Sequence, residues 1–451
     1  MCWVMQFDAI ILGAGPAGLS IAHELQRVGA KVKVLESTDR AGGSIRTIRD
    51  GEWIIETGAN TLQTEGDADL EILKGYGLKN AKQFARTASA KRFILSRGKL
   101  HTLTAHPASL LKSNLLSFTE KLRLASELFR SRENFPNESI QAFMTRRFGK
   151  AAANLLMDPV VSGIYAGDPK ELNMESCFPA IHSLEKSHRS VLLGLMQRPK
   201  VDRRIVGFKN GMQQLADAMA KPLIVGGVLE KNTRVTEIKK EGDTWTVSWV
   251  DQTQSQHTAS APRIIITLPH WHWARLPLPK SIKQSLQPWE QSQVPSVTVV
   301  ARGYKRSDVP HPLDGFGYLV PNNENREVLG CLFPSSVFSE RTPKDHVLLC
   351  CFIGGSRHPD LAAQSDEQIR ASVNRELSET LGIKHAPVKE WIQRWPQAIP
   401  QYDEKQSARE KLLEQVEGEH AGLHFLGAFR HGVSLMSVIR RGHTLAQWLS
   451  R

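Results

Sequence analysis

Cysteine is scarce in this 451-residue chain, and long apolar runs are missing from it. The five cysteines include no C-x-x-C pair and no set with metal-ligand spacing, so we expect no disulfide framework and a reduced, cytosolic setting. No apolar run approaches the ~18 residues that a transmembrane helix needs. The first strand-like run begins at Phe7, and we expect no signal or transit peptide before it.

Other absences narrow the function. Neither a G-x-S-x-G motif nor a Cys/His pairing indicates a hydrolase. His270 and His272 stand two residues apart without further ligands, so we expect no metal site. The net charge of +12 favours polyanions, anionic membranes or acidic substrates. Because no nucleic-acid motif accompanies this charge, binding of RNA or DNA is not expected. The chain length predicts two or three domains.

A strand, a glycine motif, a helix and a second strand follow one another near the start of the chain. Residues 7–12 form an apolar run typical of a buried parallel strand, and residues 19–29 have helical periodicity. The second strand, residues 31–36, ends in an acidic residue, Glu36. This order within about thirty residues predicts a dinucleotide-binding unit.

Each residue of that unit has a distinct task. Gly13 permits a tight turn, Gly15 lets the backbone approach a pyrophosphate, and Gly18 allows close packing of the helix on the strand. The helix N-terminus offers amides and a positive dipole end to phosphates, and Glu36 can bind the ribose hydroxyls. The predicted nucleotide contacts are Gly13, Gly15, Pro16, Ala17, Gly18, Glu36 and Ser37.

The next stretch separates FAD from NAD. From Glu36 to Thr47 the chain reads E-x-x-x-R-x-G-G-x-x-x-T, which resembles the second FAD motif of the monoamine oxidase–like flavoproteins. The resemblance implies that the paired glycines bring backbone to the ribityl and phosphate region and that Arg40 contacts the diphosphate. The contacts expected here are Arg40, Gly42, Gly43, Arg46, Gly58, Ala59 and Asn60.

The rest of the cofactor site is expected from distant parts of the chain. Residues 233–238 resemble the strand that meets the adenine in this family, and residues 423–426 are a further strand candidate. Ser434 can cap a helix that runs to about Trp448, and such a helix N-terminus would stabilise negative charge on a reduced flavin. Ala428 offers no side chain for a ribityl contact, whereas many relatives have an acid or asparagine there. The contacts expected from these segments are Val235, Gly427, Gly432, Val433 and Ser434.

Further motifs resemble those of the oxygen-dependent protoporphyrinogen oxidases. They are spread over nearly the whole chain, at residues 58–61, 91–94, 158–169, 329–333 and 352–357. The resemblance implies an α/β fold in which a Rossmann-type FAD-binding domain is joined by an α+β substrate domain and an inserted helical membrane-binding domain. The implied reaction is hydride transfer from protoporphyrinogen IX to FAD, with dioxygen giving hydrogen peroxide, in haem biosynthesis.

Substrate contacts follow from the same resemblance. Arg92 would pair with a propionate, for which a guanidinium is well suited because it can donate two parallel hydrogen bonds. Leu319, Leu332 and Phe352 would enclose the rings, and the backbone near Gly163 and Gly167 would line the cavity. No histidine or carboxylate stands out as an acid or base, and we assign none.

Other functions remain open at this point. Coproporphyrinogen III is the nearest alternative substrate, and an amine oxidase or a carotenoid desaturase would use the same scaffold. A different functional class would be a protein that binds flavin without catalysing a reaction, or one that serves as a membrane scaffold.

The predicted domain boundaries place helical residues between two parts of the FAD-binding domain. Residues 82–132 hold eleven Lys or Arg residues against Glu120 and Glu127. Leu111, Leu115, Phe118, Leu122, Ala125 and Phe129 recur at helical spacing, so one basic amphipathic helix is expected on an anionic membrane. The same surface could serve a homodimer, and the expected location is the inner face of the cell membrane.

The expected domain boundaries divide the chain into five parts. These are residues 1–80, 205–285 and 415–451 for FAD binding, 81–204 for the helical insertion and 286–414 for substrate binding.

Overall fold

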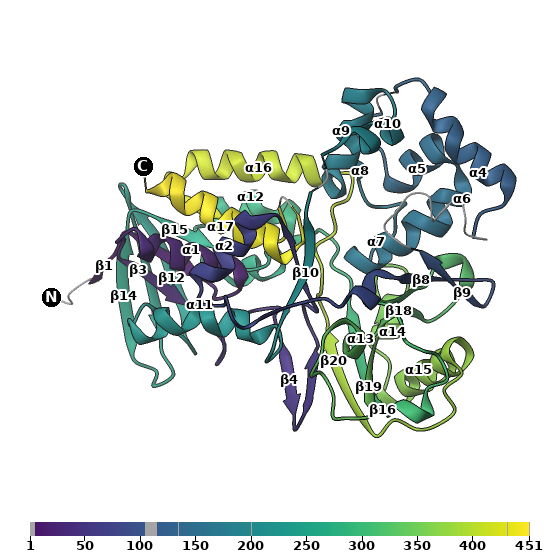
Figure 1. The fold of residues 1–451 in the computed structure, drawn as a ribbon. Helices are drawn as coiled ribbons and strands as arrows, with labels where there is room; N and C mark the ends of the chain where they lie inside the picture. Colours follow the sequence, from purple (N-terminus) through teal and green to yellow (C-terminus); the bar gives the residue numbers. More distant parts are fainter. Residues whose placement is uncertain (1–4, 104–114, 134, 200, 431, 451) are drawn as a thin grey trace.

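The computed structural model describes residues 5–103, 115–133, 135–199, 201–430 and 432–450. Figure 1 shows a domain built on a parallel sheet on one side, with a second domain built on a larger sheet beside it. A helical region lies above the second domain. The chain enters the parallel-sheet domain three times, since its strands come from residues 9–35, 229–266 and 423–425.

The parallel sheet has the order β11-β3-β2-β15-β21. Its strands are short and mostly apolar, with Lys33 paired to Glu230, and successive side chains point to opposite layers. Ile11 and Val34 pack with the helices α1, α11 and α17, whereas Ile10 and Leu35 pack with β13, α12 and α16. The elements are β2 (Ala9–Leu12), β3 (Val32–Leu35), β11 (Leu229–Glu230), β15 (Ile264–Ile266), β21 (Leu423–Phe425), α1 (Pro16–Arg27), α11 (Gln213–Val225), α12 (Lys280–Glu290), α16 (Gln406–Glu419) and α17 (Leu435–Leu449).

These bounds confirm the predicted strand–helix–strand unit. Helix α1 begins at Pro16 rather than at residue 19, because proline is pre-organised for the first helical turn. Next to this sheet lies a smaller one, ordered β1-β14-β13-β12, whose last strand extends the segment predicted at residues 233–238. Its strands are β1 (Met5–Gln6), β12 (Arg234–Glu241), β13 (Thr244–Val250) and β14 (Gln256–Ala261).

The second domain is a seven-stranded sheet ordered β20-β16-β19-β18-β17-β8-β9. One face is covered by α15, whose Ile369 and Val373 join the core beneath it. The strands and this helix are β8 (Arg92–Ser96), β9 (Lys99–Leu103), β16 (Val297–Lys305), β17 (Gly317–Leu319), β18 (Val328–Leu332), β19 (His346–Gly354), β20 (Lys389–Trp395) and α15 (Asp366–Leu381).

The helical insertion does not begin at residue 81 as expected. Residues 92–103 form two strands of the larger sheet, because β8 finds a parallel partner in β17, more than two hundred residues away. Short-range periodicity gives no sign of such a pairing. The helical region starts beyond these strands, and its elements are α4 (Phe118–Ala125), η2 (Ser126–Phe129), α5 (Ile140–Phe148), α6 (Lys150–Ala152), η3 (Ala153–Met157), α7 (Asp158–Tyr165), α8 (Met174–Cys177), α9 (Pro179–His188) and α10 (Val191–Gln197).

The single amphipathic helix expected from residue 111 to 129 is also wrong. Helix α4 starts at Phe118 because Ser117 and Glu120 form a capping box, in which each satisfies a backbone amide of the other. Leu115 lies before this start and is buried, so it does not share a face with Phe118. Leu111 lies outside the described residues. The helix stops early, and η2 follows it.

A buried ion pair holds the helical region together. Arg147 and Glu127 are both fully buried and bonded to each other, and Glu127 also accepts from the backbone amides of α10 at Val191 and Leu192. Removing one partner of such a pair typically costs about 3–5 kcal/mol.

Smaller elements connect these parts. A three-stranded sheet, β6-β10-β7, and a hairpin, β4-β5, lie between the two domains. The elements are β4 (Thr47–Asp50), β5 (Trp53–Glu56), β6 (Leu62–Glu65), β7 (Lys82–Phe84), β10 (Arg203–Phe208), α2 (Asp67–Gly75), η1 (Thr87–Ala90), η4 (His270–Arg275), η5 (Arg306–Asp308), η6 (Asn322–Glu324), α13 (Pro334–Val337) and α14 (Pro359–Ala362).

Candidate active site

Two glycine segments face each other at the N-terminus of α1. Gly13 has a φ of 104°, and a Cβ atom on Gly18 would lie 1.9 Å from the carbonyl oxygen of Gly13. A Cβ atom on Gly43 would lie 3.1 Å from the Cα of Gly15, so the paired-glycine stretch closes over the first motif. Backbone amides are therefore presented without side chains in the way, as a pyrophosphate site requires.

Glu36 lies beside this cradle. Its Oε2 accepts from the Ala14 amide at 2.8 Å, and its Oε1 accepts from the Thr38 amide at 2.9 Å. Thr233, just before β12, donates its amide to the backbone oxygen of Glu36 at 2.9 Å. This bond places the start of β12, and with it Val235, close to Glu36 at the end of β3, where the nucleotide is expected. The Thr38 hydroxyl also donates to Oε1 at 2.8 Å, so about one of the roughly four acceptor positions of the carboxylate is left for a ribose hydroxyl. Ser37 is exposed next to it.

The paired-glycine stretch is held by an unexpected set of contacts. Arg40 donates to the carbonyl oxygens of Gly43 and Ile45, so its guanidinium supports the loop itself. A contact between Arg40 and a diphosphate stays a prediction. The Ala59 amide donates to the carbonyl of Ser44, which places residues 58–60 beside residues 42–46.

Asn60 offers a direct test of whether FAD fits. Its Nδ2 donates to the Gly58 carbonyl at 3.0 Å, but its Oδ1 is buried and accepts from no described group. Buried polar atoms are rarely left unpaired, so an acceptor of this kind indicates a polar ligand. With the glycine cradle and Glu36, the residues present fit a dinucleotide that continues into a polar ring system.

The prediction that Ser434 caps a helix near the end of the sequence is confirmed. The Oγ of Ser434 accepts from the Ser437 amide at 3.2 Å and caps α17. Gly432 has a φ of 111°, a conformation that glycine tolerates best, and Val433 is partly buried against the core of the helical region. A Cβ on Gly442 would lie 2.0 Å from the Oγ of Ser20, so α17 packs closely on α1. This packing brings the C-terminal turn (residues 427–430 and 432–434) to the same domain as the glycine cradle.

Three of the predicted substrate contacts share one face of the seven-stranded sheet. Leu319 lies opposite Gly330, and Gly330 lies opposite Phe352, so these three point to the same side. Leu332 is two residues from Gly330 and therefore also points there. Leu332 and Phe352 are half-buried against Trp53, whereas the opposite face of the sheet is covered by α15.

Arg92 joins this face. Ile94 lies opposite Leu319 in the parallel pairing of β8 and β17, and Arg92 is two residues before Ile94. Its guanidinium lies 5.2 Å from the centre of the Phe316 ring, within cation–π distance. The register thus places a guanidinium at one edge of an apolar surface, which we call the sheet face (Arg92, Leu319, Leu332 and Phe352).

The two glycines expected to line the cavity differ. Gly163 is exposed, and a Cβ there would lie 2.8 Å from Cδ2 of Leu319, so its backbone lies directly against the Leu319 side chain. Gly167 is buried, and a Cβ there would meet Oε1 of Gln401 at 2.4 Å and Leu172 at 2.7 Å. The chain leaves α7 through Ala166 in a left-handed conformation and places Gly167 beside Gln401 and Leu172, and its contact with a substrate cavity stays a prediction.

Three features of the site were not anticipated. Asp158 forms an ion pair with Arg357, which joins α7 to the end of β19, and burial raises the pKa of Asp158. The indole of Trp395 donates to the Thr57 carbonyl at 2.6 Å, and this bond connects β20 to the paired-glycine side. The hydroxyl of Tyr402 forms hydrogen bonds with Ala428 and Gly432 of the C-terminal turn. Asp158 and Arg357 lie inside motifs quoted above, but residues 395–402 carry no local pattern that reveals their partners.

Glu56 lies at the junction of the two domains. Its carboxyl accepts from the Met212 amide at 2.8 Å and from the Thr47 hydroxyl at 2.6 Å. Burial raises the pKa of Glu56 to about 7, with these bonds and nearby Arg341 opposing the shift. The group therefore changes charge near neutral pH while holding the β4-β5 hairpin to α11.

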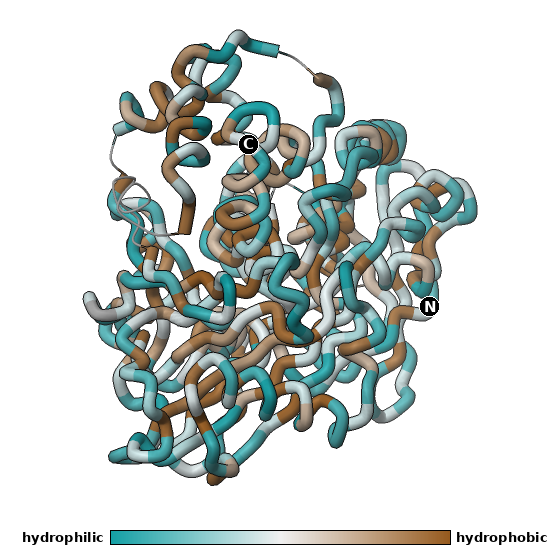
Figure 2. The backbone as a smooth tube through the Cα atoms, turned by 90° about the vertical axis from the view of Figure 1, so that its right-hand side faces the viewer, coloured by the Kyte–Doolittle hydropathy of each residue, from teal (hydrophilic) through white to brown (hydrophobic). Residues whose placement is uncertain are grey.

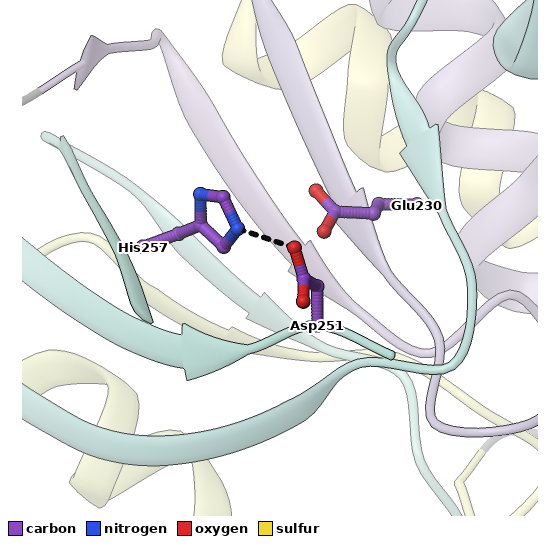
Figure 3. A group of neighbouring side chains, drawn as sticks. All are labelled: Glu230, Asp251 and His257. Atoms are coloured by element: carbon purple, nitrogen blue, oxygen red, sulfur yellow. Dashed lines mark hydrogen bonds and ion pairs between the residues drawn. The ribbon is translucent and has the colours of Figure 1, made fainter. Parts of the chain in front are cut away.

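One group of possible metal ligands exists among the described residues. Figure 3 shows Glu230 of β11 close to Asp251, which follows β13, and to His257 of β14. His257 bonds to Asp251 at 2.7 Å, and the ammonium of Lys33 lies 2.7 Å from Glu230. Each carboxylate thus already has a partner, Lys33 for Glu230 and His257 for Asp251, and the cluster is satisfied without a metal. His270 is buried among aromatic rings, its Nε2 faces the Ser292 hydroxyl at 2.7 Å, and burial lowers the pKa of His270 to about 3.

Comparison with known proteins decides the family. The model described as flavin containing amine oxidoreductase matches residues 16–448. The chain belongs to this flavoenzyme family. As in other members of the flavin-containing amine oxidoreductases, FAD is the cofactor, and the α/β arrangement of an FAD-binding and a substrate domain is that of the family.

Relatives within the family are porphyrinogen oxidases. The chain is 31% identical to the mitochondrial protoporphyrinogen oxidase of Nicotiana tabacum, over 96% of this chain and 92% of that one. It is 25% identical to the coproporphyrinogen III oxidase of Bacillus subtilis, over 96% of each chain. A crystal structure from Exiguobacterium sp. named for protoporphyrinogen oxidase superimposes with a TM-score of 0.81 at 20% identity, over 99% of this chain and 98% of that one. The flavoenzyme is thus a member of the porphyrinogen oxidase group.

Proposed function

We propose that the chain oxidises protoporphyrinogen IX to protoporphyrin IX, with FAD as cofactor and dioxygen as acceptor. The observation that carries this proposal is the sheet face, in which strand register places Arg92 at the edge of an apolar surface made by Leu319 and Phe352. A flexible apolar macrocycle with two propionates needs apolar walls and a cation at one end.

Each residue of the cavity has a proposed role. The Arg92 guanidinium pairs with a propionate and fixes which end of the macrocycle faces outward. Leu332 and Phe352 pack against the ring on the sheet side, and Gly163 lets α7 approach Leu319 closely, because a Cβ there would lie 2.8 Å from its Cδ2. The apolar walls also exclude water from the reacting carbon.

The cofactor is held by the contacts described above. We propose that the backbone at Gly13–Gly18 binds the diphosphate, that Glu36 binds the adenosine ribose, and that Asn60 supplies an acceptor nearer the flavin ring. In this arrangement the N-terminus of α17, capped by Ser434, would stabilise negative charge on the pyrimidine side of the flavin. When bound, FAD supplies the hydride acceptor and passes electrons on to dioxygen. We assign no acid or base among the described side chains.

Anaerobic reduction of the bound FAD tests this function. Stoichiometric protoporphyrinogen IX should bleach the flavin absorbance in a single turnover, and admitting air should restore it with formation of hydrogen peroxide. Failure of every porphyrinogen to bleach the flavin would overturn the proposal and favour a flavin-binding protein without this activity.

Coproporphyrinogen III is the second candidate substrate. The full-length match to the Bacillus subtilis enzyme favours it. Its four carboxylates would need more cations around the cavity than Arg92 alone. Parallel single-turnover measurements with both porphyrinogens should give the faster bleaching with protoporphyrinogen IX. A faster reaction with coproporphyrinogen III would reverse the assignment.

We further propose that the helical region docks peripherally on an anionic membrane. Among the described residues, no helix is both long and apolar enough to cross a membrane. Large apolar side chains are nevertheless exposed on this region, and Figure 2 shows its hydrophobic segments at the top of the molecule. Phe118 is 74% exposed, Phe129 81% and Met196 78%. Exposed aromatic groups beside lysines and arginines are typical of interfacial binding.

Flotation with anionic liposomes tests the docking. A variant with serine at positions 118, 129 and 196 should lose most of its liposome binding while retaining FAD. Val225 is equally exposed, on α11 of the other domain, and Val225→Ser is the matched control. Unchanged flotation of the triple variant would contradict membrane docking, and a change from dimer to monomer would assign the surface to a homodimer instead.

A further inference from the structure

Tyr402 lies where three parts of the molecule meet. It follows β20 and precedes α16, and its side chain is 1% exposed. The phenol oxygen donates to the Ala428 carbonyl at 2.6 Å and accepts from the Gly432 amide at 2.9 Å. Both partners belong to the C-terminal turn, which precedes α17.

This pair of bonds sets the width of the turn. One hydroxyl serves as donor to one end and acceptor from the other, so it holds Ala428 and Gly432 at a fixed separation. Burial raises the pKa of the Tyr402 phenol, so the oxygen keeps the proton that it donates. A second contact supports the same turn, since Gln406 of α16 donates its Nε2 to the Phe429 carbonyl at 2.9 Å.

The rest of Tyr402 belongs to the helical region. Its ring lies in the core of that region, with its centre 5.9 Å from the Tyr165 ring, and Val433 packs against the same core. Its backbone oxygen accepts from the Asn173 amide at 2.7 Å, and the next residue, Asp403, bridges to Leu172. The ring and backbone of Tyr402 are therefore fixed to the helical region, and its hydroxyl is fixed to the C-terminal turn.

We propose that Tyr402 is a positioning residue for the flavin, through which the helical region sets the place of the turn at residues 427–434 against the ring system. This inference rests on the proposed placement of FAD against Gly432 and Ser434. It gives the helical region a second task besides surface binding, because a shift of its core would be transmitted to the flavin through one side chain.

The test compares two tyrosine variants of the holoenzyme. Tyr402→Phe keeps the ring and removes only the hydroxyl that bonds to the turn. Tyr165→Phe is matched to it, because Tyr165 is equally buried in the same core but donates to the Cys177 carbonyl, within the helical region. Release of FAD on dilution, followed by the fluorescence of free FAD, should be about tenfold faster in Tyr402→Phe, the change expected when one buried hydrogen-bonding group is lost. Tyr165→Phe should release FAD at the wild-type rate.

A second measurement separates positioning from general destabilisation. In Tyr402→Phe the visible circular dichroism of bound FAD should change and hydrogen exchange at residues 427–434 should accelerate, while both stay as in wild type for Tyr165→Phe. Equal effects of the two variants, or no effect of Tyr402→Phe on FAD release, would overturn the inference. No substrate is used, so a failure of wild type to oxidise porphyrinogens leaves this test intact, whereas a wild type that binds no FAD defeats both proposals.

Discussion

The dinucleotide unit occupies residues 9–36 without interruption, whereas the sheet face gathers four side chains from strands that span residues 92 to 352. In the first, a Cβ added to Gly18 would meet a backbone oxygen, which cannot move without displacing a strand. In the second, a Cβ added to Gly163 would meet the end of the flexible Leu319 side chain. We therefore expect substitutions in the dinucleotide unit to abolish stable folding and FAD binding, whereas substitutions on the sheet face should lower activity by degrees.

Gly18→Ala should have the largest effect. Its methyl group would lie 1.9 Å from the Gly13 carbonyl oxygen and 2.7 Å from Oγ1 of Thr267, so α1 must move off the sheet. We expect a loss of about 3 kcal/mol or more in unfolding free energy, and purified protein without FAD. Gly75→Ala is the control, because a Cβ there meets nothing within 4 Å. A Gly18→Ala protein that retains FAD would contradict the rigidity of this unit.

Glu56→Gln tests the junction between the two regions. Its folded-state pKa of about 7 lies above the ordinary 4.5, so the protonated form stabilises the fold at low pH. That contribution is full below about pH 4.5 and is lost as pH rises through 7, a change of up to about 3 kcal/mol. Chemical denaturation from pH 5 to 8 should show that wild type loses more stability than the Gln variant. Glu52→Gln, on the exposed turn of the same hairpin, should follow wild type. Parallel pH profiles for wild type and Glu56→Gln would refute this assignment.

Arg92→Ala should weaken substrate binding without loss of FAD. Removing a charged hydrogen bond of about 1.5–3 kcal/mol predicts a rise in KM of roughly ten- to a hundredfold. Steady-state kinetics and the flavin absorbance per chain measure the two quantities. Lys99→Ala, at an exposed position on the neighbouring strand β9, should leave KM unchanged. Loss of FAD from Arg92→Ala would contradict the assignment of Arg92 to the substrate site.

Gly163→Ala should have the smallest effect. Its methyl group would press on Leu319, which can rotate away at a cost of about 1 kcal/mol. We expect kcat/KM to fall by less than tenfold, with unchanged FAD content and thermal stability. A loss of folding as severe as that of Gly18→Ala would remove the contrast between the two regions.

Local signals predicted part of this molecule well. The glycine spacing, the helix that begins at Pro16 and the Ser434 cap depend on residues within one or two turns of each other, so their chemistry is visible in the sequence. The helix expected from residue 111 to 129 failed for a local reason as well, since the Ser117 capping box starts a new helix within it. The apolar spacing alone did not reveal that start.

Long-range contacts were not predictable in this way. Strand β8 was expected in a helical insertion, because its parallel partner β17 is distant in sequence and parallel strands need no turn between them. The contact of Gly167 with Gln401, which the left-handed Ala166 makes possible, likewise had no signal in the sequence. Tyr402 had no predicted role, because neither Ala428 nor Gly432 is near it in sequence.

By itself, the sequence determined that this protein has a dinucleotide fold, and the motifs spread along it indicated FAD and a porphyrinogen. Those conclusions follow from residue types at short spacings, where backbone geometry leaves few alternatives. Only the tertiary structure decided that Arg92, Leu319, Leu332 and Phe352 share one face, since a register shift of one residue would point a strand's side chains to the opposite side. It likewise decided that Tyr402 connects the helical region to Ala428 and Gly432 in the C-terminal turn, because one buried hydroxyl can join segments that only folding brings together.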